Sequence, residues 1–116
     1  MVKYQVIFHL DEDDSAKVNL VINNIFNLLE DLGRDNVLIE LLVNGPAVKA
    51  FQKNSQNIAE RVRQLADQGV TFALCNNSLK MFGFRAEDML EQVIIVPAGV
   101  GELVKKQSEG WAYIRP

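Results

Sequence analysis

Cys75 is the residue of this chain with the clearest capacity for chemistry, because it is the only thiol in the sequence. It ends an apolar run, Val70–Leu74, and polar residues that can open a helix follow it. The free N–H groups at the start of a helix favour an anion, and a cysteine there can ionise below its free pKa of about 8.5. Two interpretations remain open: a reactive thiolate, or a buried cysteine that packs as a small hydrophobic side chain.

His9 is the only histidine and lies at the end of the first apolar run. It could take the proton of Cys75 or orient a substrate. We favour the alternative of a strand-end histidine that hydrogen-bonds to the backbone. A Cys–His hydrolase is disfavoured because no third residue is evident to orient the pair. One histidine and one cysteine also argue against a zinc site within a single chain.

Runs rich in branched and aromatic residues alternate with segments of helical periodicity along the chain. The runs predict strands at residues 2–9, 36–43, 70–75, 92–96 and 111–115. The other segments predict a first helix ending near residue 32, then helices or turns at 47–51, 55–69, 78–82, 86–90 and 100–109. This alternation predicts one domain over residues 1–116, with a mainly parallel sheet and helices on both faces. The first, third and fourth strands are nearly continuous in apolar residues, so we expect them to be buried.

Ligands of open parallel sheets bind beyond the carboxyl ends of the strands, near the point where strand order reverses. The strand order cannot be obtained from this sequence, but the strand ends can. We therefore expect an anion or substrate site to be formed by the residues that follow the strands: His9, Asn44, Gly45, Cys75, Asn76, Asn77, Ser78, Pro97 and Gly99.

Two other segments resemble functional motifs but have simpler explanations. The acidic run Asp11–Asp14 could hold a metal or a phosphorylation pocket. A receiver domain, however, would have an aspartate at the end of strand three and a lysine after strand five, where this chain has Cys75 and Arg115-Pro116. Capping of the first helix explains the run better. The segment Gly99-Val100-Gly101 lacks the third glycine of a dinucleotide fingerprint and does not follow the first strand, so a tight turn explains it.

The first helix carries Asn19, Asn23 and Asn27 at four-residue intervals, although asparagine is unfavourable inside helices. Leu20 also falls on the polar side of this helix. A subunit interface and a solvated face explain these residues equally well, and both stay open.

Composition excludes several classes of partner. The chain has 116 residues and a formal net charge of −3, with no basic stripe, so nucleic acid is not an expected partner. Its apolar runs are far shorter than the roughly 20 residues that span a bilayer, and the N-terminus does not resemble a signal peptide. A lone thiol is typical of a reducing compartment. We expect a cytoplasmic protein without membrane partner, metal or cofactor.

With Cys75 at the end of strand three, the sequence resembles the DsrE/DsrF-like family over nearly its whole length. The ordered set of matching segments comprises Val6–Asp11, Val43–Gly45, Val96–Leu103 and Gln107–Ile114. The resemblance implies a three-layer α/β/α fold and a homo-oligomer, either a trimer or a hexamer. It also implies sulfur relay, in which a cysteine matching Cys75 carries a persulfide between donor and acceptor proteins. His9 and Asn44 match family-like positions, but no catalytic role is carried over to them.

The leading hypothesis is therefore a sulfur carrier or sulfurtransferase-type protein with Cys75 as its catalytic residue. In this hypothesis Asn76, Asn77, Ser78 and nearby N–H groups stabilise the anion, and the turn 97–101 helps to line the site. The alternative is a non-catalytic oligomeric module that binds a small anion or a partner at the same strand ends. A structural subunit that needs a paralogue is a third possibility.

Overall fold

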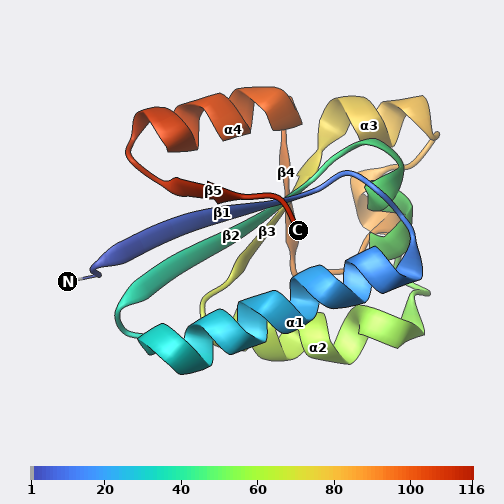
Figure 1. The fold of residues 1–116 in the computed structure, drawn as a ribbon. Coiled ribbons are helices and arrows are strands. Elements are labelled where there is room, and N and C mark those ends of the chain that lie inside the picture. Colours follow the sequence, from blue (N-terminus) through green and yellow to red (C-terminus); the bar gives the residue numbers. More distant parts are fainter. Residues whose placement is uncertain (1) are drawn as a thin grey trace.

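Five parallel strands form one sheet in the computed structural model, which describes residues 2–116 (Figure 1). They are β1 (Tyr4–Leu10), β2 (Val37–Val43), β3 (Thr71–Cys75), β4 (Val93–Val96) and β5 (Ala112–Ile114). Their order across the sheet is β4-β3-β2-β1-β5. The α/β fold, the parallel sheet and the five strands agree with the sequence-based prediction, and strand boundaries differ from it by one or two residues.

Helices cover both faces of this sheet, as Figure 1 shows, with α1 and α2 on one side and α4 on the other. The helical segments are α1 (Ser15–Leu32), η1 (Gly45–Phe51), α2 (Gln56–Asp67), α3 (Asn76–Met81), η2 (Ala86–Asp88) and α4 (Gly99–Ser108). Their positions match the sequence-based expectation, except that α3 begins directly after Cys75 rather than at Ser78. The three layers are therefore those of an α/β/α fold.

The start of α1 shows why the acidic run precedes it. The carboxylate of Asp14 accepts a hydrogen bond from the backbone N–H of Lys17 at 3.1 Å, which satisfies one of the free donors of the helix end. Asp11 pairs instead with Arg115, whose guanidinium lies 3.0 Å from both carboxylate oxygens. Helix capping and an ion pair to the chain's last residues thus account for Asp14 and Asp11.

Two of the asparagines of α1, Asn19 and Asn23, contact the neighbouring helix α2. The guanidinium of Arg61 donates to the side-chain oxygens of Asn19 and Asn23, which lie one turn apart. These two residues therefore join two helices within one chain, an explanation that the sequence did not suggest. Leu20 is exposed, as its position off the apolar stripe indicated.

The apolar residues of the sheet separate into two clusters of very different size. The larger one lies between the sheet and the α1–α2 layer, and α3 contributes Leu79 to it. The smaller one lies between the sheet and α4 and consists of Ile7, Leu42, Ala73 and Val96 of the sheet and Leu103 of α4, with Trp111 against it. The connection after β3 therefore leads to one face of the sheet, whereas the connection after β4 leads to the other. This divergence between adjacent strands is where open parallel sheets form ligand sites.

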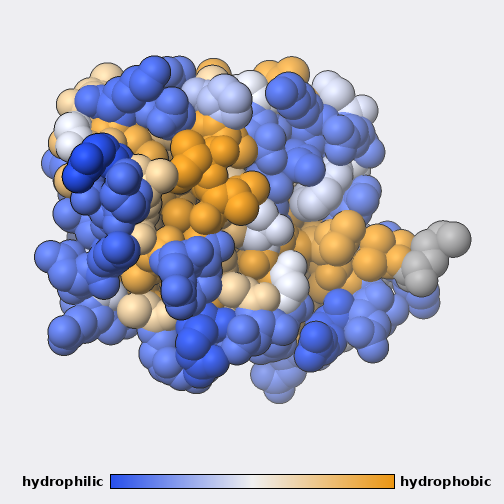
Figure 2. Space-filling model, turned by 180° about the vertical axis from the view of Figure 1, so that it is seen from behind, coloured by the Kyte–Doolittle hydropathy of each residue, from blue (hydrophilic) through white to orange (hydrophobic). Residues whose placement is uncertain are grey.

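The face covered by α4 is incompletely shielded from solvent. A helix is about 10 Å wide, whereas five strands spaced by about 4.8 Å span roughly 19 Å, so one helix leaves part of the face open. Leu38 of β2 and Ile94 of β4 are exposed there, and Val100 and Val104 are exposed on α4. Figure 2 shows hydrophobic surface gathered at the centre of the side on which β4 lies. Strand four is thus an exposed edge strand with Ile94 48% exposed, which corrects the expectation that it is buried.

Within residues 2–116, none of the helices combines the length and the apolar character needed to cross a membrane.

Candidate functional site

Cys75 is the last residue of β3 and also the N-cap residue of α3. The residue is only 5% exposed. The chain continues from Cys75 into α3, and the start of α4 at Gly99 packs against Cys75. The position results from a short apolar strand that ends in polar, helix-opening residues, as the sequence indicated.

The sulfur of Cys75 is surrounded by hydrogen-bond donors. Burial of the thiol raises its pKa, but the Ser78 hydroxyl and three backbone N–H groups outweigh this effect, so that the pKa lies below its ordinary value. The N–H groups belong to Gly99, Ser78 and Asn77. They come from the starts of two different helices, α3 and α4. The site is therefore arranged to stabilise a thiolate rather than a neutral thiol.

Ser78 links the cysteine to the turn that follows β2. Its buried hydroxyl oxygen accepts a hydrogen bond from the N–H of Gly45 at 2.8 Å. Because that oxygen is engaged as an acceptor, its hydrogen is left to donate to the sulfur of Cys75. Gly45 has a φ of 59°, a conformation that glycine adopts without steric cost.

Gly99 allows the start of α4 to approach the sulfur closely. A Cβ atom at this position would lie 3.1 Å from the Asn44 Cβ and 3.2 Å from the Cys75 Cβ. Another 3.1 Å contact would form with Leu42 Cδ1. Only a residue without a side chain fits here without a shift, so Gly99 brings Asn44, Cys75 and α4 together.

His9 is held by two side chains instead of by the backbone. Its Nε2 lies 2.9 Å from Asn44 Oδ1, and its Nδ1 lies 2.7 Å from the hydroxyl of Tyr113. The expectation of a backbone hydrogen bond is therefore wrong. With Asn44 as acceptor, the proton sits on Nε2, and Nδ1 accepts from Tyr113. Both ring nitrogens are thereby engaged away from Cys75.

The remaining residues named from the sequence lie at the periphery. Asn76 is the half-buried first residue of α3, and Pro97 is exposed after β4. Neither is among the groups that hydrogen-bond to the sulfur of Cys75. The side chain of Asn77 is exposed, and its contribution comes from its backbone N–H.

Sequence reasoning missed two features beside this site. Tyr113, which fixes His9, lies 104 residues away along the chain, and nothing local to either residue links them. Glu40 is buried on the face that α4 covers. A signal for Glu40 was visible, because it is a lone charged residue in the otherwise apolar run Val37–Val43.

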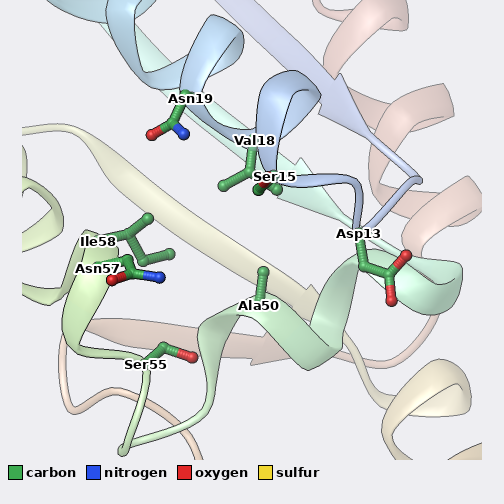
Figure 3. Close-up of a pocket in the computed structure, with 8 residues that line it drawn as sticks. All are labelled: Asp13, Ser15, Val18, Asn19, Ala50, Ser55, Asn57 and Ile58. Carbon is green, nitrogen blue, oxygen red and sulfur yellow. The ribbon is translucent and has the colours of Figure 1, made fainter.

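A separate hollow of about 370 Å³ lies between α1, η1 and the start of α2. In Figure 3 the apolar side chains of Val18, Ala50 and Ile58 line its interior, and polar side chains stand around it. The hollow is lined by Asp13, Ser15, Val18, Asn19, Ala50, Ser55, Asn57 and Ile58. None of these residues was expected to form the cysteine site.

The fold and the site together define a class: small α/β/α proteins with a parallel sheet and a stabilised cysteine where adjacent strands diverge. Comparison with known families then identifies the chain as a member of the DsrE/DsrF-like family, whose profile matches residues 3–116. Proteins of this family are generally associated with sulfur relay.

Solved structures agree with this assignment. Protein MTH1491 of Methanobacterium thermoautotrophicum, described as of unknown function, is 43% identical, with a TM-score of 0.92 over 97% of this chain and 99% of its own. The ychN protein of Escherichia coli shares the fold at 17% identity, with a TM-score of 0.80 and complete coverage of both chains. BT1422 of Bacteroides thetaiotaomicron, also of unknown function, is 16% identical, with a TM-score of 0.77 over 97% of this chain and 94% of its own. Among curated proteins, none matches this sequence.

Proposed function

We propose that this protein is a sulfur carrier of the sulfurtransferase type, in which Cys75 holds a persulfide in the reducing cytoplasm. The observation that carries the proposal is the set of donors around the sulfur of Cys75, supplied by the starts of two helices in a chain of the DsrE/DsrF-like family. Such a set favours the thiolate, which is the nucleophilic form of cysteine.

The transfer consists of two thiolate exchanges. The Cys75 thiolate attacks the outer sulfur of a donor persulfide, a new S–S bond forms, and the donor's S–S bond breaks with its electron pair leaving on the donor thiolate. An acceptor thiolate then attacks the outer sulfur now held by Cys75. The Cys75 thiolate leaves, so the carrier returns to its starting state. The outer sulfur changes partner twice, and no external oxidant or reductant is needed.

The neighbouring residues act on the thiolate in both steps. The Ser78 hydroxyl and the N–H groups of Asn77 and Gly99 stabilise it as nucleophile in the first step and as leaving group in the second. Asn44 and Gly45 hold these donors in place through their contacts with Gly99 and Ser78. In this proposal Asn76 and Pro97 lie at the mouth of the site, and His9 orients Asn44 rather than acting as a base.

Mass spectrometry after incubation with a persulfide donor tests the proposal. We expect the intact chain to gain the mass of sulfur, and we expect Cys75→Ser to gain none. A small-molecule thiol treated in parallel verifies that the donor is active. If the donor modifies that thiol and leaves Cys75 unmodified, the carrier function is wrong.

One observation favours a second candidate function. Cys75 is 5% exposed, which also suits a non-catalytic module whose strand-end site binds a small anion or a partner. This module would keep its ligand affinity in Cys75→Ser, whereas the carrier would lose its function completely. Titration of the thiol by alkylation separates the two, because a slowly alkylated thiol of ordinary pKa favours the module.

The incompletely covered face supports an additional proposal, that the chain forms a homo-oligomer, either a trimer or a hexamer. Val100 and Val104 lie one turn apart on α4 and are exposed, as are Ile94 and Leu38 on the sheet. Burial of this apolar surface against another copy would be favourable. Light scattering tests it: the wild-type chain should be oligomeric, and Val104→Glu should shift it toward the monomer. A monomeric wild-type chain would contradict the homo-oligomer. Sulfur donor and acceptor proteins remain the other partners in this proposal.

A further inference from the structure

Glu40 is a buried ionisable residue that the proposed sulfur chemistry does not use. It lies in the middle of β2, only 3% exposed, and its side chain faces α4. Its neighbours in register on the adjacent strands are Ile7 on β1 and Thr71 on β3, neither of which carries a charge. An ionised carboxylate in such surroundings is costly unless it is fully paired.

The pairing of Glu40 is incomplete. Its Oε1 lies 3.8 Å from the Nζ of Lys106, which is beyond hydrogen-bond length. The same ammonium group lies over the ring of Trp111, 4.7 Å from the ring centroid. The other oxygen of Glu40, Oε2, is buried, and no N–H or hydroxyl group within residues 2–116 donates to it. Lys106 alone therefore does not satisfy this carboxylate.

A second carboxyl group lies beside the first. Glu102 of α4 is within hydrogen-bonding reach of Glu40, and Glu109 at the end of the same helix adds further negative charge. Burial and the hydrogen bond to Glu102 raise the pKa of Glu40 to about 8, against the opposing charge of Lys106. Two adjacent carboxyl groups cannot both ionise cheaply, and a proton held between them turns one into a donor for the other.

The contact between Glu40 and Glu102 affects the Cys75 thiol because it fixes the position of α4 on the sheet. Glu102 and Lys106 lie four residues apart on one side of the helix, and Gly99 begins that helix three residues before Glu102. The N–H of Gly99 is one of the donors to the sulfur of Cys75. A contact that holds the first turns of α4 on β2 therefore also holds this donor on the sulfur.

We propose that Glu40 and Glu102 share one proton and that this carboxyl pair positions α4 so that Gly99 donates to the Cys75 sulfur. Glu40 is then a positioning residue for the proposed carrier, and the meaning of the inference for sulfur transfer rests on that function. The charged groups that act on the pair are Lys106 and Glu109, both from α4 and its end.

Two substitutions separate the donor role of Glu40 from its bulk. Glu40→Gln keeps an N–H donor for Glu102 without a charge, whereas Glu40→Leu removes the donor and keeps an apolar side chain of similar size. We expect Cys75 in Glu40→Leu to ionise at higher pH, with a thiolate fraction at neutral pH that is several-fold lower. We expect Glu40→Gln to restore the wild-type profile. Glu30→Gln, at an exposed glutamate of α1, is the matched control and should not change it.

The measurements are the pH dependence of Cys75 alkylation and a ¹³C NMR titration of the glutamate carboxyl groups. One carboxyl of the wild-type protein should titrate near pH 8, and this signal should be missing from Glu40→Gln. The proposal is overturned if every glutamate titrates near its ordinary value. It is also overturned if Glu40→Leu folds and alkylates as the wild type does. Neither readout requires a persulfide, so failure of sulfur loading alone would count against the carrier function and leave this inference standing.

Discussion

The hydroxyl of Ser78 connects the thiol with the turn after β2. It accepts from the N–H of Gly45 and donates to the sulfur of Cys75, so its removal leaves one backbone donor unpaired and takes one donor from the thiolate. A hydrogen bond to a charged group contributes about 1.5–3 kcal/mol. Ser78→Ala should therefore reduce the thiolate fraction of Cys75 at neutral pH by at least about tenfold.

Alkylation rates across a pH series measure this change. Ser108→Ala provides the matched control, because Ser108 is exposed at the end of α4. An unchanged alkylation profile in Ser78→Ala would show that the hydroxyl does not stabilise the thiolate.

Part of the site around Cys75 could be predicted from the sequence, because some of its residues are neighbours in the chain. Cys75 and Ser78 follow a strand directly, so the strand's end and the helix signals place them at the same edge of the sheet. The contact between His9 and Tyr113 was not predictable, because it depends on β5 returning beside β1, a pairing that no local pattern indicates. The buried Glu40 was visible as an interruption of an apolar strand, but its partner Glu102 belongs to a helix whose position over β2 is a tertiary property.

At the scale of elements, the approach of α4 to β3 depends on the absence of a side chain at Gly99. Gly99→Ala would bring a Cβ to within 3.1 Å of Asn44 and 3.2 Å of Cys75, so α4 must move outward. We expect Gly99→Ala to lower the free energy of unfolding by about 1–3 kcal/mol, as is usual for an overpacked contact. We also expect its Cys75 thiol to ionise at higher pH, because the N–H of Gly99 moves away from the sulfur.

Gly101 offers a control on the same helix. A Cβ there would meet only the Cβ of Ala98 at 3.8 Å, an ordinary contact, and alanine is favoured over glycine inside a helix by about 1 kcal/mol. Gly101→Ala should thus leave the thiol unchanged and not destabilise the chain. Chemical denaturation and thiol titration of both variants check the pair, and equal effects at the two positions would contradict the role given to Gly99.

The element pattern was largely predictable because helix and strand periodicities depend on neighbouring residues. The burial of individual strands was less predictable from the sequence. Strand four resembles β1 and β3 in composition, yet it lies at the edge of the sheet with Ile94 exposed. Strand order decides this difference, and it is set by the packing of the whole chain rather than by the apolar content of one segment.

At the scale of the whole molecule, the buried Glu40 makes stability depend on pH. Its pKa is about 8 in the folded protein against 4.5 as an ordinary glutamate, so between these values the folded state binds the proton that the unfolded state releases. The contribution of Glu40 to the free energy of unfolding is therefore largest below about pH 4.5, and it decreases as the pH rises towards 8.

Urea unfolding of the wild type and of Glu40→Gln across this pH range measures the effect. The difference between the two isolates Glu40, because Cys75 and the other titrating groups are common to both proteins. We expect the wild type to lose stability relative to Glu40→Gln as the pH rises from about 4.5 to 8, whereas Glu30→Gln should follow the wild type. If the difference in unfolding free energy stays constant with pH, Glu40 ionises equally in the folded and unfolded chains, and the buried carboxyl pair does not hold a proton.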